Sequence, residues 1–532
     1  MPDDSQQWMK GAVILTAAAM MIKVLSAVYR VPFQNIVGDT GFYIYQQVYP
    51  IYGIAAVLAA SGFPVAISRI VAEKGADPNG GSEHLHKILQ TAFFVLCLVG
   101  TGLFLLVFLG AGTISRWMGD PLLAPVIQVV AFFFLFLPFL SLWRGISQGV
   151  GNMAPTAISQ FIEQLIRVAA ILIVSYLLVN AGFSLYDTGR GVWAGALAGG
   201  LAGMAVLGIF IKKSKKRLLV SLPLLSIQEL ASTGKTLLTH GVAICFSGLL
   251  LILFQLVDSL NLYSLLVQSG FGSEDAKSLK GVFDRGQPLI QLGTVAAASL
   301  SLALVPAVTA AWIQDNQEIL QKKVSTSLKI SMTVGLGAAA GLINIIRPAN
   351  IMLFQTGDGS AVLAVLAVSI FFASIIMTVS GILQGVGEVM SPAKYIMVGV
   401  LGKYIGNLLL VPVYGTMGAA LSTVMGLFVA CLLMLWKLNT AFSILSELRH
   451  SFIPLAASAV AMTAVLRVWL FIFDLFGTDG RLFQTAASLT GVVVGGSVYL
   501  MVLMRTRLFT DEEIGHIPYG SKLAVFGRRK TG

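Results

Sequence analysis

Two apolar segments near the N-terminus, GAVILTAAAMMIKVLSAVYRV (residues 11–31) and YIYQQVYPIYGIAAVLAASGFPVAISRIV (residues 43–71), decide the fold class of this chain. Each segment is long enough to cross the hydrocarbon core of a bilayer, about 30 Å thick, as a helix. Between them lies the short stretch Gly38-Asp39-Thr40-Gly41, whose composition is typical of a turn. The sequence therefore predicts two membrane spans joined by a tight corner.

Both segments carry positive charge where hydrocarbon is expected. Lys23 and Arg30 lie in the first span, about two helical turns apart and so on one face, and Arg69 lies near the end of the second. A cation at that depth costs about 2.5–3.5 kcal/mol to insert. Neither span offers a carboxylate at matching depth, so we expect this face to line a polar cavity that receives an anion. The alternative is that the cationic ends extend along the helix to the interface, which suits Arg30 and Arg69 better than Lys23.

The remainder of the chain has the same apolar character. Of 532 residues, 56% are hydrophobic and only 11% are charged, and the mean hydropathy is +0.85. Such a composition excludes a soluble domain of this size and predicts an all-α polytopic membrane protein with about fourteen transmembrane helices. The expected span cores are 11–31, 43–71, 88–110, 122–143, 156–180, 190–211, 235–258, 287–312, 325–347, 360–384, 393–413, 415–437, 450–473 and 482–504.

The positive charge is distributed unevenly among the loops. A basic run at 212–217 and the basic tail at 505–532 both lie on the cytoplasmic side if the N-terminus is cytoplasmic. The sequence thus predicts a multi-pass plasma-membrane protein with both termini in the cytoplasm. The formal net charge of +11 reflects these loops and does not indicate nucleic-acid binding. The stretch 212–234 is expected to be a basic amphipathic linker on the membrane surface.

A short internal repeat divides the chain. Ile146-Ser147-Gln148-Gly149-Val150-Gly151 recurs about 236 residues later as Ile382-Leu383-Gln384-Gly385-Val386-Gly387, and a cation follows each copy at the same offset, Arg167 and Lys403. The repeat predicts two pseudo-symmetric lobes of six spans each, followed by two more helices. The expected divisions are an N-lobe at 1–211, the linker at 212–234, a C-lobe at 235–440, the last two spans at 441–504 and the tail at 505–532.

Few acidic side chains accompany the intramembrane cations. Glu163 stands four residues before Arg167 and is expected to pair with it on one helix face, and Asp258 ends the seventh expected span. Glu163, Arg167, Asp258 and Lys403 are therefore candidates for an ion-coupling or secondary role. The positive charge that remains after pairing suits a phosphate or pyrophosphate group.

Motifs of enzymes and metal proteins are missing from the sequence. It contains no nucleophile elbow, phosphate-binding loop or zinc helix motif, and its three cysteines lie far apart within expected spans. We therefore expect neither an enzyme nor a bound cofactor or metal. Transport would draw its energy from a gradient or from the substrate.

Several motifs resemble one family. These are Tyr29-Arg30-Val31-Pro32-Phe33, Tyr49-Pro50-Ile51-Tyr52, Gly62-Phe63-Pro64-Val65-Ala66-Ile67-Ser68, Asp284-Arg285-Gly286-Gln287-Pro288-Leu289 and Ser301-Leu302-Ala303-Leu304-Val305-Pro306. They are similar to the polysaccharide-exporter branch of the multidrug/oligosaccharidyl-lipid/polysaccharide (MOP) flippase superfamily, which includes stage V sporulation protein B and the MurJ-type lipid II flippases. The resemblance implies a V-shaped, two-lobed transporter that works by alternating access around a cationic cavity.

The resemblance also implies roles for four residues. Lys23, Arg30, Arg69 and Arg285 occupy places comparable to the essential arginines of family flippases, although Lys23 replaces the usual arginine and so lacks its bidentate geometry. Lys23, Arg30 and Arg285 would hold a pyrophosphate, and Arg69 would help to close the inner side.

The expected function is to flip an undecaprenyl-pyrophosphate-linked saccharide, such as a peptidoglycan precursor, across the plasma membrane. The expected partners are this anionic lipid-linked oligosaccharide, membrane lipids and cell-wall synthesis proteins. The alternatives are export of another lipid-linked polymer, an ion-coupled multidrug antiporter that depends on Asp258 and Glu163, and a scaffold that acts through its basic loop and tail.

Overall fold

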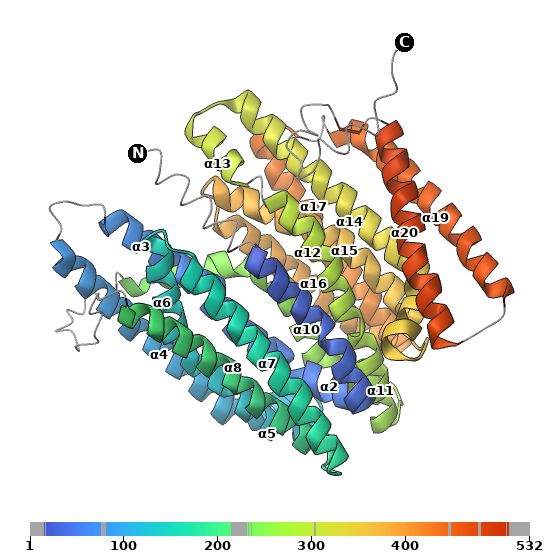
Figure 1. Cartoon of the computed structure of the whole chain (residues 1–532), viewed down its shortest axis with the longest axis horizontal. Coiled ribbons are helices and arrows are strands. Elements are labelled where there is room, and N and C mark those ends of the chain that lie inside the picture. The colour runs from blue at the N-terminus through green and yellow to red at the C-terminus, as the bar shows by residue number, and fades with distance from the viewer. Residues whose placement is uncertain are drawn as a thin grey trace. The chain divides into compact units, whose positions relative to one another are not determined.

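The computed structural model describes residues 15, 17–75, 81–213, 231, 233–235, 237–302, 305–444, 448–476, 480–506 and 508–509. Throughout these ranges the regular structure is helical, with no strand (Figure 1). Twelve helical runs within them are long and apolar enough to cross a membrane. The expected all-α polytopic architecture is therefore confirmed.

The helices follow one another with short connections. A helix over residues 17–28 precedes α2 (Arg30–Val57), the π-helical turn η1 (Leu58–Gly62), α3 (Phe63–Gly75), α4 (Gly81–Trp117), α5 (Ala124–Ala131), α6 (Leu137–Gly149), α7 (Ala154–Asn180), α8 (Leu185–Lys213), α10 (Val242–Gln268) and α11 (Ser273–Asp284). The chain continues with α12 (Gly286–Leu302), α13 (Val305–Ile313), α14 (Gln317–Phe354), α15 (Ser360–Gly385), α16 (Met390–Tyr414), α17 (Thr416–Phe442), α19 (Phe452–Leu475) and α20 (Arg481–Arg505).

The first candidate span, residues 17–73, is in fact two helices folded against each other. Gly38 interrupts α2 with φ 69° and ψ −176°, a conformation that only glycine adopts easily. The hydroxyls of Tyr29 and Tyr45 lie 2.7 Å apart although 16 residues separate them, whereas a straight helix would hold them about 24 Å apart. The chain therefore reverses at Gly38, and the expected corner between the first two spans is confirmed.

The helix count agrees roughly with the sequence. The first candidate run covers two expected spans, and the span expected at 287–312 falls on α12 and α13, which are each too short to count alone. The expected linker and tail fall largely on 214–230 and 510–532, which lie outside the described residues. Predictions about those two segments stay predictions.

The contacts divide the chain into two compact units, residues 1–284 and residues 285–532. In the first unit α2 contacts α5, α7, α8, α10 and α11, while α3 packs on α6 and α7 on α8. Glycines allow the α3–α6 approach, because a Cβ at Gly145 would lie 2.6 Å from Ile67 and one at Gly149 would lie 2.5 Å from Val71. The helices α10 and α11 thus group with the first unit; the lobe boundaries expected from the sequence stay a prediction.

In the second unit α15 packs against α12, α14 and α17, and α16 packs on α17. The last two helices, α19 and α20, contact each other and α14. The Tyr499 hydroxyl on α20 donates to the backbone carbonyl of Thr333 on α14 at 2.7 Å. This bond attaches the C-terminal helix pair to the body of the unit.

The repeated hexapeptide has one backbone geometry in both units. It closes α6 in the first and α15 in the second, and the last glycine of each copy has positive φ, 81° at Gly151 and 90° at Gly387. The hydrogen bonds match: Val150 N–H donates to Ile146 O, and Val386 N–H donates to Ile382 O, both at 3.1 Å. The sequence repeat is therefore a structural repeat at this turn.

Candidate functional site

A π-helical turn opens the backbone in the middle of the first unit. At η1 the Phe63 N–H bonds the carbonyl five residues earlier, so the Ala59 carbonyl loses its usual helical donor. Pro64 has no N–H and therefore leaves the Ala60 carbonyl without a donor from its own helix. Gln160 Nε2 on α7 donates to Ala60 O at 3.4 Å. A local irregularity thus draws polar side chains of neighbouring helices toward α2 and α3.

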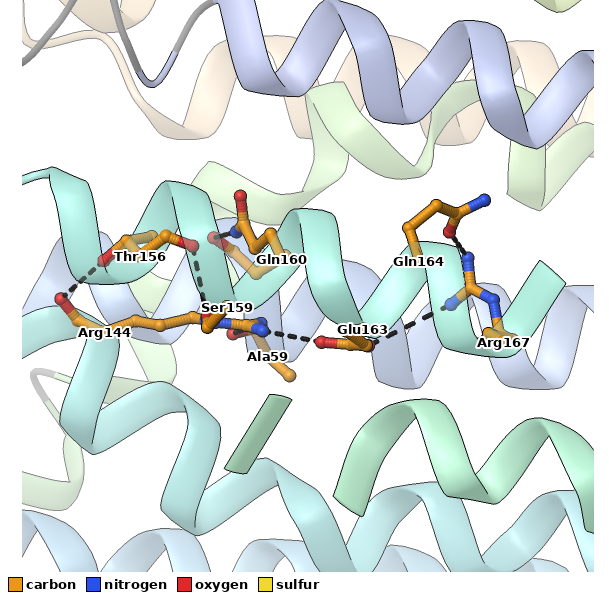
Figure 2. Close-up of polar contacts among 9 residues, drawn as sticks. Ala59, Arg144, Thr156, Ser159, Gln160, Glu163, Gln164 and Arg167 are labelled. Carbon is orange, nitrogen blue, oxygen red and sulfur yellow. Dashed lines mark hydrogen bonds and ion pairs between the residues drawn. The ribbon is translucent and has the colours of Figure 1, made fainter. Parts of the chain in front are cut away.

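Arg144 on α6 supplies the donor for the other carbonyl. Its Nη1 donates to Ala59 O at 3.2 Å, its Nε to Ser159 Oγ at 3.3 Å, and its Nη2 to Glu163 Oε2 at 2.6 Å (Figure 2). The side chain is buried, with 1% of the residue exposed. The guanidinium therefore joins α6, α7 and η1.

Arg167 lies on the other side of the same carboxylate. Its Nη1 is 4.0 Å from Glu163 Oε1, its Nη2 donates to Gln164 Oε1, and its guanidinium carbon lies 4.6 Å from the centre of the Tyr52 ring. Gln164 in turn donates to the Ser26 hydroxyl at 2.8 Å. The network thus reaches from α6 through α7 to the first span.

The pairing expected from the sequence was therefore incomplete. Glu163 and Arg167 do form an ion pair, but the hydrogen-bonded partner of Glu163 is Arg144, which the sequence reasoning had not selected. The expected fourth span ended at residue 143 and so placed Arg144 at the membrane surface. The useful signal was an arginine inside the otherwise apolar run that leads into Gly145 and the repeat.

Arg30 approaches the same aromatic surface from the first strand of the corner. Its guanidinium carbon lies 4.3 Å from the centre of the Tyr49 ring, the residue is 2% exposed, and its Nε has no hydrogen-bond partner among the described residues. The rings of Tyr49 and Tyr52 are 5.8 Å apart on one face of α2. Arg30 and Arg167 therefore occupy neighbouring aromatic rings, one helical turn apart.

Trp193 on α8 supports these rings. Its indole stacks on Tyr45 at 4.6 Å with an interplanar angle of 5°, and it contacts Tyr52 at 5.3 Å. Trp193 is fully buried. The rings that face the arginines are thus held from behind by a rigid aromatic layer.

We name Arg30, Arg144 and Arg167 the arginine cluster. Glu163 is the carboxylate for which the described residues show ion pairs with this cluster. One negative charge against three buried positive charges leaves a local excess of positive charge. Such a site is suited to an anion with several oxygens, because guanidinium groups bind phosphate and carboxylate oxygens bidentately.

The other residues expected to bind substrate lie in different surroundings. Lys23 is exposed, and Arg69 is an exposed residue whose Nε donates to Glu73 at 2.6 Å. Arg285 is 1% exposed and donates to the Thr356 hydroxyl at 2.8 Å within the second unit. Convergence of Lys23, Arg30 and Arg285 on one cavity stays a prediction.

The remaining candidates for ion coupling are buried. Asp258 lies on α10 with 0% exposed, and Lys403 on α16 with 1% exposed. Lys403 Nζ donates to the Thr423 hydroxyl at 2.8 Å. Their proposed coupling role stays a prediction.

The sequence reasoning also missed a buried ion pair on α11. Lys280 was expected in an outer loop, but its Nζ lies 2.7 Å from both carboxylate oxygens of Asp284, and both side chains are fully buried. The helix packs tightly on α2, since a Cβ at Gly281 would lie 2.1 Å from the Asp39 carbonyl oxygen. Its polar composition concealed this burial, which depends on contact with the Gly38 corner.

The fold places the protein in a known class of membrane transporters. The structure is similar to that of a lipid II flippase MurJ in an inward closed conformation, with a TM-score of 0.67 and 16% identity over 93% of this chain and 99% of that one. It is also similar to an inward-facing multidrug resistance MATE family transporter of the MOP superfamily, with a TM-score of 0.65 and 19% identity over 82% and 99% of the chains. The chain is a multi-pass membrane protein with this fold.

Sequence comparison then defines the family. The model of the polysaccharide biosynthesis protein family matches residues 8–312, more than half of the chain, and the protein belongs to this family. From Bacillus subtilis (strain 168), it is 45% identical to the uncharacterized membrane protein YabM over 99% of both chains. It is 25% identical to that organism's lipid II flippase MurJ over 93% and 95% of the chains, and 26% identical to its stage V sporulation protein B over 98% and 99%. The family resemblance read from the motifs is confirmed.

Proposed function

We propose that this protein is a flippase that moves an undecaprenyl-pyrophosphate-linked saccharide, such as a lipid II-like peptidoglycan precursor, across the plasma membrane by alternating access. The observation that carries the proposal is the arginine cluster, in which three buried guanidinium groups face one carboxylate. Burying excess charge in a membrane protein is expensive unless a ligand or water compensates it. The relationship to a lipid II flippase supports the same substrate class.

Within this proposal Arg30 and Arg167 bind the phosphates. Their neighbouring positions on the Tyr49 and Tyr52 rings, whose centres are 5.8 Å apart, suit two linked phosphoryl groups. Lys23 and Arg285 contribute further positive charge, and Arg69 acts at the cytoplasmic closure. Both termini lie in the cytoplasm.

The alternative function is an ion-coupled multidrug antiporter, which the similarity to a MATE transporter keeps in view. That function requires carboxylates able to bind a cation. The contacts of Glu163 argue against it, because this carboxylate already accepts a hydrogen bond from Arg144 and faces Arg167.

Growth complementation tests the proposal. Arg30→Ala and Arg167→Ala, each at normal membrane levels, should fail to restore growth of a bacterium depleted of its lipid II flippases. Arg116→Ala is the control, since Arg116 is exposed and its contacts lie within α4 at Gly112 and Thr113. Reconstituted vesicles with labelled lipid-linked saccharides should show the matching loss of flipping. Full growth with both cluster variants would contradict the proposal, and drug resistance lost with Asp258→Asn would favour the antiporter.

A further inference from the structure

The contacts of Glu163 are unequal. One carboxylate oxygen is 2.6 Å from Arg144 Nη2 and makes a hydrogen bond, whereas the other is 4.0 Å from Arg167 Nη1, within reach of charge attraction but beyond a hydrogen bond (Figure 2). Arg144 has two further acceptors, Ala59 O and Ser159 Oγ. Arg144 is thus anchored, while the contact between Glu163 and Arg167 is loose.

The carboxylate also has room to move. Glycine at 203 on α8 leaves this space, because a Cβ there would lie 3.1 Å from Glu163 Oε2. The side chain of Glu163 remains 15% exposed, in contrast to 2% for Arg144. A small rotation would bring the carboxylate to hydrogen-bond distance of Arg167, which lies one helical turn further along α7.

We infer that Glu163 is an internal competitor for Arg167: it turns from Arg144 to Arg167 when the substrate leaves and so displaces the phosphate from that guanidinium. The inference rests on the proposed function. While a phosphate is bound at Arg167, Glu163 stays on Arg144 and the anion experiences the full charge of Arg167. When Glu163 reaches Arg167, the excess positive charge falls by one and the anion is released. Glu163 is accordingly a positioning residue that sets how tightly the site holds its anion.

Binding of inorganic pyrophosphate to the purified full-length protein in detergent tests this role. Glu163→Gln keeps the shape of the side chain and removes the competing charge, so the affinity for pyrophosphate should rise by roughly tenfold or more. Lost packing would lower affinity, so a rise distinguishes competition from a structural role. The matched control is Glu318→Gln, in which the carboxylate also stands four residues from a cation, Lys322, but both are exposed; its affinity should equal that of the wild type.

A second variant covers the case in which Glu163→Gln does not fold. Arg144→Gln together with Glu163→Gln removes both members of the hydrogen-bonded pair and leaves no uncompensated charge. Arg167 then lacks its competitor, and the affinity should again rise, by less than in the single variant. In vesicles, either variant should bind the labelled lipid-linked saccharide but flip it more slowly, because release is impaired.

The outcomes separate the inference from the proposed function. Arg167→Gln should abolish pyrophosphate binding, and wild-type affinity in that variant would overturn the proposed role of the cluster itself. If Arg167→Gln abolishes binding but the folded Glu163 variants bind pyrophosphate no more tightly than the wild type, the inference is wrong and the proposed function stands. A rise in the Glu163 variants that Glu318→Gln does not show supports the inference.

Discussion

Two groups of buried charges in the first unit differ in their balance. On α11 the ammonium of Lys280 faces the carboxylate of Asp284 at 2.7 Å, and both side chains are fully buried. Between α6 and α7, Glu163 is shared by two arginines and is 15% exposed. A balanced pair within one helix can hold a structure without a ligand, whereas an unbalanced cluster is stabilised further by an added anion. The comparison therefore separates a structural pair from a binding site.

The largest effect is expected where the charges are balanced. Lys280→Met leaves the buried carboxylate of Asp284 without its ammonium and should destabilise the protein by about 3–5 kcal/mol. Thermal unfolding of the purified protein in detergent measures the loss. Lys280→Met combined with Asp284→Leu should recover most of it, because no unpaired charge remains. A single variant as stable as the wild type would show that this pair does not hold α11.

A smaller loss of stability is expected in the unbalanced cluster. Arg144→Leu removes the hydrogen-bonded partner of Glu163, but the carboxylate can turn to Arg167 and stays partly hydrated, so we expect a loss of about 1–3 kcal/mol. Pyrophosphate binding should nevertheless fall sharply, because Glu163 then neutralises Arg167. The comparison with Lys280→Met fails if Arg144→Leu is the more destabilising change or leaves pyrophosphate affinity unaltered.

The smallest effect concerns the space beside the carboxylate. Alanine in place of a helical glycine typically stabilises a protein by about 0.4–1 kcal/mol, and Gly208→Ala on α8 should do so, since its Cβ would lie at an ordinary 3.9 Å from Trp143. Gly203→Ala should gain less, because its Cβ would press on Glu163 at 3.1 Å. Unfolding temperatures of the two variants measure the difference. Equal gains would show that the carboxylate moves away freely.

Much of the fold could be predicted because membrane insertion is a local property. A span needs a run of apolar residues whose length is set by the bilayer, so hydropathy located the helices. The corner at Gly38 and the turn at Gly151 and Gly387 were predictable for a similar reason, since positive φ favours glycine. The interruption at α12 and α13 was not, because hydropathy does not report a break within an apolar run.

The candidate site was predictable in kind but not in its pairings. An excess of buried positive charge followed from residue types, and Arg30 and Arg167 both lie buried in the first unit. The role of Arg144 did not follow, because its partner Glu163 is 19 residues away and on another helix. Helical spacing favoured Arg167, which is correct for proximity along α7 but does not include the side chain that α6 contributes.

From the sequence alone this protein is a polytopic helical membrane protein with a repeated architecture and positive charges where hydrocarbon should be, because length, hydropathy and backbone preference belong to each segment separately. Only the tertiary structure decided which of those charges are neutralised. Lys280 became buried when α11 packed on the corner of α2, and Glu163 met Arg144 where the π-helical turn freed the Ala59 carbonyl. Neutralisation depends on distances between helices, and those distances are set by packing rather than by spacing along the chain.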